Sequence, residues 1–221
     1  MSAPASQFSL ASYWAQGDAL SHFVAYLLLA MSLVSWAIII AKLVSGLRVR
    51  RAAPAVDAFW NASTLHDGLA LLRVADREDI FLPLPSAGLA HTAGAATVAG
   101  EMSRDEQVVR VLRQAITRST HRVESGLTVL ASIGATAPFV GLLGTVWGIY
   151  HALSTVSAHG VVQIDQVAGP VGEALIMTAF GLLVAIPAVL AYNALNRLNR
   201  MTLAELDGFA HDLQAYFISR P

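Results

Sequence analysis

Three long stretches of this chain carry no charged side chain: residues 19–41, 125–164 and 174–196. A helix needs about 20 predominantly apolar residues to cross the hydrocarbon core of a bilayer, so each stretch can hold one crossing. The composition agrees, because 55% of the 221 residues are hydrophobic and only 13% are charged, which is unusual for a soluble domain. We therefore predict an all-α integral membrane protein with three transmembrane helices, at 23–44, 126–153 and 173–194.

The basic residues suggest how the chain is oriented in the membrane. All 14 Lys and Arg residues fall within 42–51, 73–122 or 197–220. Because cytoplasmic segments of membrane proteins are enriched in these residues, we expect the N-terminus outside and the C-terminus inside, which for a bacterial-type inner membrane means periplasm and cytoplasm. The predicted periplasmic segments are 1–22 and a connecting loop at 154–172, and the predicted cytoplasmic segments are 45–125 and 195–221.

The segment 45–125 is predicted to be mostly helical. Pro54 suits the first turn of a helix, whereas the prolines within 81–85 predict a break. From residue 105 onward, apolar and small residues recur on one helical face. No breaker is evident before the second span, so the pattern favours one continuous helix over 105–153, about 70 Å long. The residues of this stripe are Val108, Val111, Leu112, Ala115, Ser119 and Val123.

A second apolar stripe follows the third span. Apolar residues recur along this segment, which predicts that the third span continues as a C-terminal helix. They are Leu198, Leu206, Phe209, Leu213 and Phe217. Helices that carry such stripes out of the membrane need partners to cover them. The two stripes together therefore indicate a homo-oligomer.

Glu173 is the one acidic residue in the apolar stretch 173–196. A carboxyl group at the edge of a membrane span is costly and is usually kept for a function, and a single proton decides its charge. It is therefore a candidate proton carrier. The alternative is a structural role, because an acid at the start of a helix also suits the positive end of the helix dipole. The residues alone support both interpretations about equally.

The second span carries small residues along one side. Gly144 and Gly148 form a GxxxG pair, which allows helices to approach closely in lipid, so packing is favoured over a chemical role. Thr145 adds a hydroxyl that either bonds the backbone four residues earlier or lines a pore, and both readings stay open. The residues assigned to packing in this span are Gly134, Pro138, Gly141, Gly144 and Gly148.

Other functional classes are disfavoured by what the sequence lacks. The chain has no cysteine, so disulfides and thiolate metal sites are excluded. Because no phosphate-binding loop, metalloprotease motif or nucleophile–base pair is present, neither an enzyme nor a cofactor is expected. The formal net charge of −1 argues against a nucleic-acid partner. A solute transporter would be expected to contain internal repeats, so a non-conducting scaffold is the main alternative to a proton carrier.

Two segments carry a resemblance to a known family. They are ASIGATAPFVGLLGTVWGI at 131–149 and GEALIMTAFGLLVAIPAVLAYN at 172–193. Together they resemble the ExbB/TolQ/MotA family of proton-channel proteins, most closely its ExbB branch and next its TolQ branch. The likeness is dense over about 128–200, whereas residues 1–125 share the architecture and little of the motif.

The resemblance implies a fold and a set of partners. ExbB-type proteins form cyclic pentamers around a central pore, which holds a dimer of single-span ExbD-like helices. The complex uses the proton-motive force and passes work to a TonB-like protein, which drives outer-membrane receptors. TolQ-type proteins serve the Tol-Pal envelope system instead.

The resemblance also assigns roles to individual residues. By position, the intramembrane acid of the family falls on Glu173, and its two pore threonines fall on Thr145 and Thr178. Five residues separate Glu173 from Thr178, about 140° around an ideal helix, so the two do not share a narrow face. Matching packing positions in the third span are Gly181, which follows Thr178 by three residues, and Pro187.

A ring of basic residues is expected at the cytoplasmic membrane surface. Such residues attract anionic phospholipid headgroups, at about 1 kcal/mol for each cation near the surface. The alternative is that they only orient the protein, and the sequence favours neither. The eight residues are Lys42, Arg48, Arg50, Arg51, Arg118, Arg122, Arg197 and Arg200.

Overall fold

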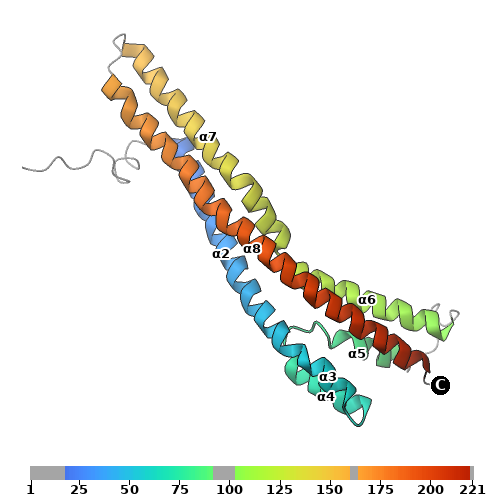
Figure 1. Ribbon diagram of the computed structural model, residues 1–221. Coiled ribbons are helices and arrows are strands. Elements are labelled where there is room, and N and C mark those ends of the chain that lie inside the picture. Colours follow the sequence, from blue (N-terminus) through green and yellow to red (C-terminus); the bar gives the residue numbers. More distant parts are fainter. Residues whose placement is uncertain (1–17, 92–102, 160–163, 220–221) are drawn as a thin grey trace, which may run out of the picture. The chain divides into compact units, whose positions relative to one another are not determined.

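The computed structural model describes residues 18–91, 103–159 and 164–219, without the side chains of 91, 155–159, 164–170 and 173 (Figure 1). Nearly all described residues are helical, and none of them forms a β-strand. The helices are α2 (Ala19–Ala52), α3 (Pro54–Trp60), α4 (Leu65–Ala75), α5 (Pro83–His91), α6 (Arg104–Glu124), α7 (Leu127–His159) and α8 (Ile164–Ser219).

The predicted all-α architecture with three apolar crossings is confirmed. Among the described residues, three helical stretches are long and apolar enough to span a membrane, and they lie within Ala19–Trp60, Arg104–Ser154 and Ala174–Ser219. The chain divides into two compact units, and α2, α7 and α8 each contribute to both. The first unit comprises Met1–Ile39 and Thr128–Tyr192, and the second comprises Ile40–Leu127 and Asn193–Pro221.

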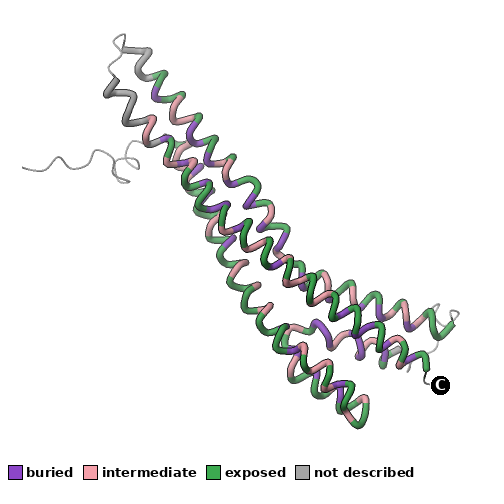
Figure 2. The backbone as a smooth tube through the Cα atoms, viewed as in Figure 1, coloured by how far each residue is buried: buried purple, intermediate pink, exposed green. Residues whose placement is uncertain are grey.

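In the first unit, parts of α2, α7 and α8 lie side by side (Figure 1). Large apolar side chains on these helices point outward: Phe139 is 71% exposed, Leu183 65% and Leu33 64%. Figure 2 shows exposed residues recurring along all three helices. Such a surface suits lipid or the apolar faces of other subunits.

Small residues set the contact between α7 and α8 in the first unit. A Cβ placed on Gly134 would lie 2.5 Å from Val189, and a Cβ on Gly148 would lie 3.0 Å from Ala174. As residue numbers rise along α7, their partners on α8 fall, so the two helices run antiparallel. Cβ atoms almost never approach other heavy atoms within 3.0 Å, so larger residues would push these helices apart.

The second unit has an ordinary hydrophobic core. Phe209 of α8 packs edge-to-face against Phe59 of α3, with ring centroids 5.4 Å apart, and lies near Phe81, at 6.5 Å. The predicted stripe on α6 is confirmed, because its members are buried except for Val111, which is half-buried. The predicted C-terminal stripe is confirmed as well. Four of its residues, Leu206, Phe209, Leu213 and Phe217, are buried, and Leu198 is half-buried. Both stripes belong to one hydrophobic core within this unit, so the inference that other subunits must cover them is wrong.

A buried acid organises the chain between α4 and α5. Asp76 is 2% exposed, and its carboxylate accepts hydrogen bonds from the backbone N–H groups of Ile80, Phe81 and Leu82, at 3.1, 2.7 and 2.8 Å. Ser119 of α6 donates its hydroxyl to the carbonyl of Ile80 at 2.8 Å. These bonds satisfy polar groups that a buried loop would otherwise leave unpaired.

The structure differs from two sequence predictions about where helices are interrupted. Helix α5 begins at Pro83, so this proline starts a helix where a break was predicted; the first turn needs no N–H donor and therefore accepts proline. The continuous helix predicted over 105–153 is wrong, because Ser125 and Gly126 separate α6 from α7. Gly126 has φ 81°, a left-handed conformation that glycine adopts without steric cost.

The predicted connecting loop at 154–172 is mostly helical in the structure. Helix α7 continues to His159 and α8 begins at Ile164, so the described residues of that loop, 154–159 and 164–172, are helical. The predicted N-terminal segment lies outside the described residues up to residue 17.

Candidate functional site: a hydroxyl pair at the crossing of α7 and α8

Thr145 and Thr178, the two threonines singled out from the sequence, lie together in the first unit. The hydroxyl of Thr178 donates to that of Thr145 over 3.4 Å, a long and therefore weak hydrogen bond. Thr145 is only 4% exposed, and its own hydroxyl donates to the carbonyl of Leu142 at 2.7 Å. Thr145 thus bonds the backbone three residues earlier, instead of four, and also meets a second hydroxyl.

The hydroxyl pair lies at a close approach of the α7 and α8 backbones. A Cβ on Gly141 would lie 2.6 Å from the carbonyl oxygen of Met177 and 3.2 Å from the Cα of Thr178. A Cβ on Gly181 would lie 2.7 Å from the carbonyl oxygen of Ala137. Each glycine therefore faces the main chain of the opposite helix, and backbone contact places the two hydroxyls.

Helix α2 also contacts α7 and α8, at Gly144, about one helical turn after Gly141. A Cβ on Gly144 would lie 3.1 Å from side-chain atoms of both Met177 on α8 and Val24 on α2. Val24 and Met177 are buried, at 0% and 1% exposure. All three helices of the first unit therefore meet at Gly144, the residue before Thr145. The predicted packing residues Pro138 and Pro187 lie within α7 and α8, and Pro138 is close enough to α8 to contact Gly181.

Glu173 lies in helix α8, and its side chain is outside the described residues. Its neighbour Ala174 is buried against Gly148 of α7. The backbone of Glu173 therefore belongs to the same α7–α8 contact as the threonine pair. The structure brings Thr145 and Thr178 together, and the direction of the Glu173 carboxyl stays a prediction.

Asp18 is a polar residue of the first unit that the sequence analysis missed. Its carboxylate accepts from the backbone N–H of Ser21 at 2.8 Å and also from the indole N–H of Trp147 on α7. Burial alone would raise the pKa of Asp18, but these bonds and the charge of His151 lower it overall. An Asp directly before a long apolar run is a recognisable N-cap signal, whereas its bond to α7 has no signal in the sequence.

Ion pairs in the second unit engage several of the basic residues expected at the membrane surface. Arg48 pairs with Glu78 at 3.0 Å, and Arg122 pairs with Asp79 at 3.4 Å. The hydrogen bond from Arg48 holds the pKa of Glu78 below its usual value, although partial burial opposes this and Ser45 adds a second bond. Arg48 and Arg122 stay more than half exposed, so the lipid prediction is untested by these contacts.

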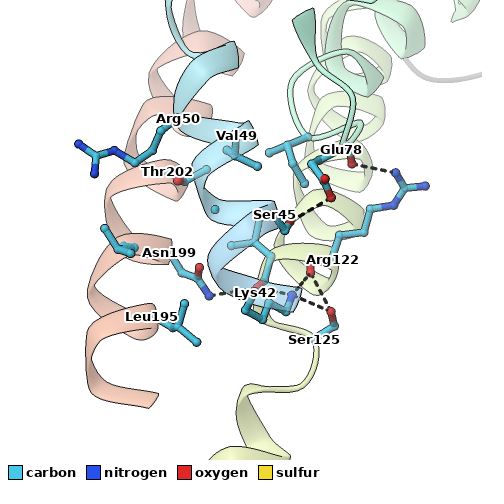
Figure 3. Close-up of a pocket in the computed structure, with 14 residues that line it drawn as sticks. Lys42, Ser45, Val49, Arg50, Glu78, Arg122, Ser125, Leu195, Asn199 and Thr202 are labelled. Atoms are coloured by element: carbon cyan, nitrogen blue, oxygen red, sulfur yellow. Dashed lines mark hydrogen bonds between the residues drawn. The ribbon is translucent and has the colours of Figure 1, made fainter. Parts of the chain in front are cut away.

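A cavity of about 350 Å³ lies beside these ion pairs, within the second unit (Figure 3). Residues of α2, α6 and α8 line it together with Glu78, which lies between α4 and α5, and the guanidinium of Arg50 points away from it. The lining residues labelled in the view are Lys42, Ser45, Val49, Arg50, Glu78, Arg122, Ser125, Leu195, Asn199 and Thr202.

Known proteins match this chain over most of its length. The MotA/TolQ/ExbB proton channel family matches residues 85–207. A biopolymer transport protein ExbB from Xanthomonas campestris pv. campestris is 46% identical over 210 residues, which cover 91% of this chain and 83% of the relative. An ExbB from Neisseria meningitidis is 39% identical over 215 residues, covering 92% of this chain and 94% of the relative.

A Tol-Pal system protein TolQ from Pseudomonas aeruginosa is also similar. It is 34% identical over 200 residues, covering 85% of this chain and 83% of the relative. With its three apolar helices, this chain is a multi-pass membrane protein. It belongs to the MotA/TolQ/ExbB proton channel family.

Proposed function

We propose that this protein is the proton-conducting subunit of a bacterial inner-membrane complex that energises TonB-dependent transport across the outer membrane. The observation that carries the proposal is the hydroxyl pair of Thr145 and Thr178, held at a backbone-to-backbone contact inside a predominantly apolar unit. Polar side chains are expensive in a membrane span and mark ion pathways.

Glu173 is the titrating group of the proposed path. It is the only acidic residue in the third span, so it can take up a proton from one side of the membrane and release it to the other. Thr145 and Thr178 follow it within the same helix contact. A hydroxyl both donates and accepts a hydrogen bond, so the pair can pass a proton on or hold a water that does.

The proposed complex is a cyclic pentamer around a dimer of ExbD-like single-span helices, with a TonB-like protein as the recipient of the work. The exposed apolar faces of the first unit support assembly, because they include large side chains such as Phe139 and Leu183. The N-terminus lies in the periplasm and the C-terminus in the cytoplasm, as the basic residues indicate.

The decisive experiment replaces Glu173 in a strain that depends on this protein for TonB-driven uptake. Glu173→Gln keeps the shape of the side chain and cannot titrate, so we expect normal assembly, normal capture of the partner helix and no uptake. Glu173→Asp should retain part of the activity. Glu205→Gln is the matched control, because Glu205 is an exposed acid on the same helix.

Full uptake by Glu173→Gln at normal expression would falsify the proton-carrier role and leave the scaffold interpretation standing. Thr145→Val and Thr178→Val remove the hydroxyls while keeping the branched shape. We expect each to reduce uptake less than Glu173→Gln, because a water molecule can replace one hydroxyl.

A TolQ-like role is the second candidate. The ExbB relatives that align along most of the chain are 39–46% identical, whereas the TolQ relatives are 33–34% identical, which favours the ExbB role. Complementation separates the two. We expect the gene to restore TonB-dependent uptake to a strain lacking ExbB. In a strain lacking TolQ, we expect it not to repair the envelope defect.

Orientation is tested by adding single cysteines, since the chain has none. A cysteine at the exposed Ser154 should react with an impermeant maleimide in spheroplasts. A cysteine at Val74, which is 80% exposed, should react only after the membrane is opened. The reverse pattern would invert the proposed topology.

A further inference from the structure

The end of helix α6 is held by side chains from two other helices (Figure 3). The last carbonyls of a helix lack their usual N–H partners. Here the ammonium of Lys42 on α2 donates to the carbonyls of Arg122 and Val123, at 2.9 and 3.1 Å. It also donates to the hydroxyl of Ser125 at 2.9 Å. The side-chain amide of Asn199 on α8 donates to the carbonyl of Val123 at 3.0 Å.

We call Lys42, Ser125 and Asn199 the clasp. Its position along the chain is specific. The three segments that continue into the first unit leave the second unit at Ile40, Leu127 and Asn193. Each of these segments contributes one clasp residue within a few positions of that point. The clasp therefore ties together all three connections on the side of the second unit.

The residue types fit this role. Lys42 is the only lysine in the chain, and all other basic side chains are arginine. An ammonium group directs three donors in different directions, whereas the planar guanidinium suits carboxylates. Arg48 and Arg122 pair with carboxylates, and the single lysine stands where two carbonyls and a hydroxyl must be satisfied at once.

The joint between α6 and α7 has a competing arrangement. In a continuous helix, the carbonyls of Arg122 and Val123 would accept from the N–H groups of Gly126 and Leu127. Lys42 and Asn199 would then lose these acceptors. Apart from the glycine, the sequence around the joint is compatible with a continuous helix. The adjoining cavity of about 350 Å³ gives water access to the freed groups.

We propose that Lys42 and Asn199 are positioning residues for energy coupling, which hold the α6–α7 joint broken so that α6 stays tied to α2 and α8. This inference rests on the proposed function. In this proposal, the clasp residues take no part in proton transfer. It fixes the arrangement of the second unit at the three points where the membrane helices enter it, so that a change in those helices is transmitted to α6.

The test removes the donors and follows both the joint and the activity. Lys42→Met keeps a long apolar stem without donors, and Asn199→Leu keeps the size of the amide. Arg50→Met is the matched control, because Arg50 lines the same cavity and is exposed. In the assembled complex, we expect the backbone amides of Gly126 and Leu127 to exchange about tenfold more slowly in both clasp variants, because the continuous helix would bond them, and to stay unchanged in the control.

Uptake should fall by at least about fivefold in Lys42→Met and Asn199→Leu, the lower end of typical coupling effects. Assembly and capture of the partner helix should persist. The amine of Lys42 provides a separate readout, since it is the only side-chain amine. Asn199→Leu and Ser125→Ala should increase its rate of acetylation, whereas Glu173→Gln should leave the exchange at the joint unchanged.

Normal uptake in both clasp variants, together with loss of uptake in Glu173→Gln, would overturn the inference and leave the proposed function intact. Normal uptake in Glu173→Gln would instead overturn the proposed function. If Lys42→Met does not assemble, Ser125→Ala decides, because it removes one acceptor of the ammonium and keeps the charge. An unchanged acetylation rate and unchanged uptake in Ser125→Ala would then reject the clasp.

Discussion

Helix α8 contacts its neighbours mainly through small residues in the first unit and through large residues in the second. In the first unit it presents Gly181 and Ala174 to α7, while Leu183 points outward. In the second unit it presents Phe209 and Leu213 to its neighbours. In lipid, burying a large apolar side chain gains little, so close backbone approach dominates. In water the same burial is strongly favourable. In the proposed topology the first unit lies in lipid and the second in water, so one helix changes its inward residues from small to large where its proposed solvent changes.

The substitution with the largest expected effect on this comparison is Phe209→Ala in the second unit. Phe209 is 2% exposed and contacts the rings of Phe59, Trp60 and Phe81. Truncating such a residue should cost about 3–5 kcal/mol of unfolding free energy. Thermal unfolding in mild detergent, followed by circular dichroism, measures the change. Phe139→Ala in the first unit is the control, and an equal loss there would contradict the difference between the units.

Asp76→Ala should have the next largest effect. It leaves three backbone N–H groups unpaired in a buried loop, at a cost of about 3 kcal/mol. The expected result is faster hydrogen exchange at residues 80–82 and a lower unfolding temperature. Asp67→Ala is a suitable comparison, because Asp67 is exposed. Equal effects of the two substitutions would show that burial of Asp76 is unimportant.

Gly141→Ala tests the close approach in the first unit. The added Cβ would lie 2.6 Å from the carbonyl oxygen of Met177, so the helices must move apart, at a cost of about 1–3 kcal/mol. Gly208→Ala has open space around it and should stabilise helix α8 by up to about 1 kcal/mol. The two substitutions are therefore expected to shift the unfolding temperature in opposite directions. A stabilised Gly141→Ala would refute the packing account.

The smallest expected effect is a pH dependence of the second unit. The pKa of Glu78 is lowered from its ordinary value of 4.5, first by the hydrogen bond from Arg48. A lowered pKa in the folded state contributes stability above the unfolded value, and this contribution is lost as the pH falls through the folded value. Because Arg48 is half exposed, we expect less than about 1 kcal/mol. Unfolding temperatures of wild type and Arg48→Gln should converge below pH 4.5; a constant difference would reject the assignment.

Local patterns were sufficient for much of the fold. The three spans follow from uncharged windows, and the buried face of α6 follows from the spacing of residues such as Leu112 and Val123, because both signals lie within one segment. The broken joint at Gly126 was missed. Its partners Lys42 and Asn199 lie 81 and 76 positions away from Val123, and a glycine alone predicts only a weak point.

For the candidate site too, the sequence predicted which residues matter but not how they contact one another. The positions of Thr145 and Thr178 were assigned through the family resemblance, but their contact depends on how closely α7 and α8 approach. The bond between Asp18 and Trp147 likewise joins two helices far apart in sequence. Such pairings depend on three-dimensional packing, and single-sequence periodicity carries no information about them.

The glycine contacts at Gly141 and Gly181 have a consequence for the precision of the proposed proton path. Side chains adjust their rotamers readily, so a gap set by side chains varies with every substitution nearby. At these two glycines main chain meets main chain, and no side-chain rotamer lies between the helices at this point. The distance between the Thr145 and Thr178 hydroxyls is therefore set by backbone contact, which varies little. Substitutions on the outward faces of α7 and α8 can therefore accumulate without changing the distance between these hydroxyls.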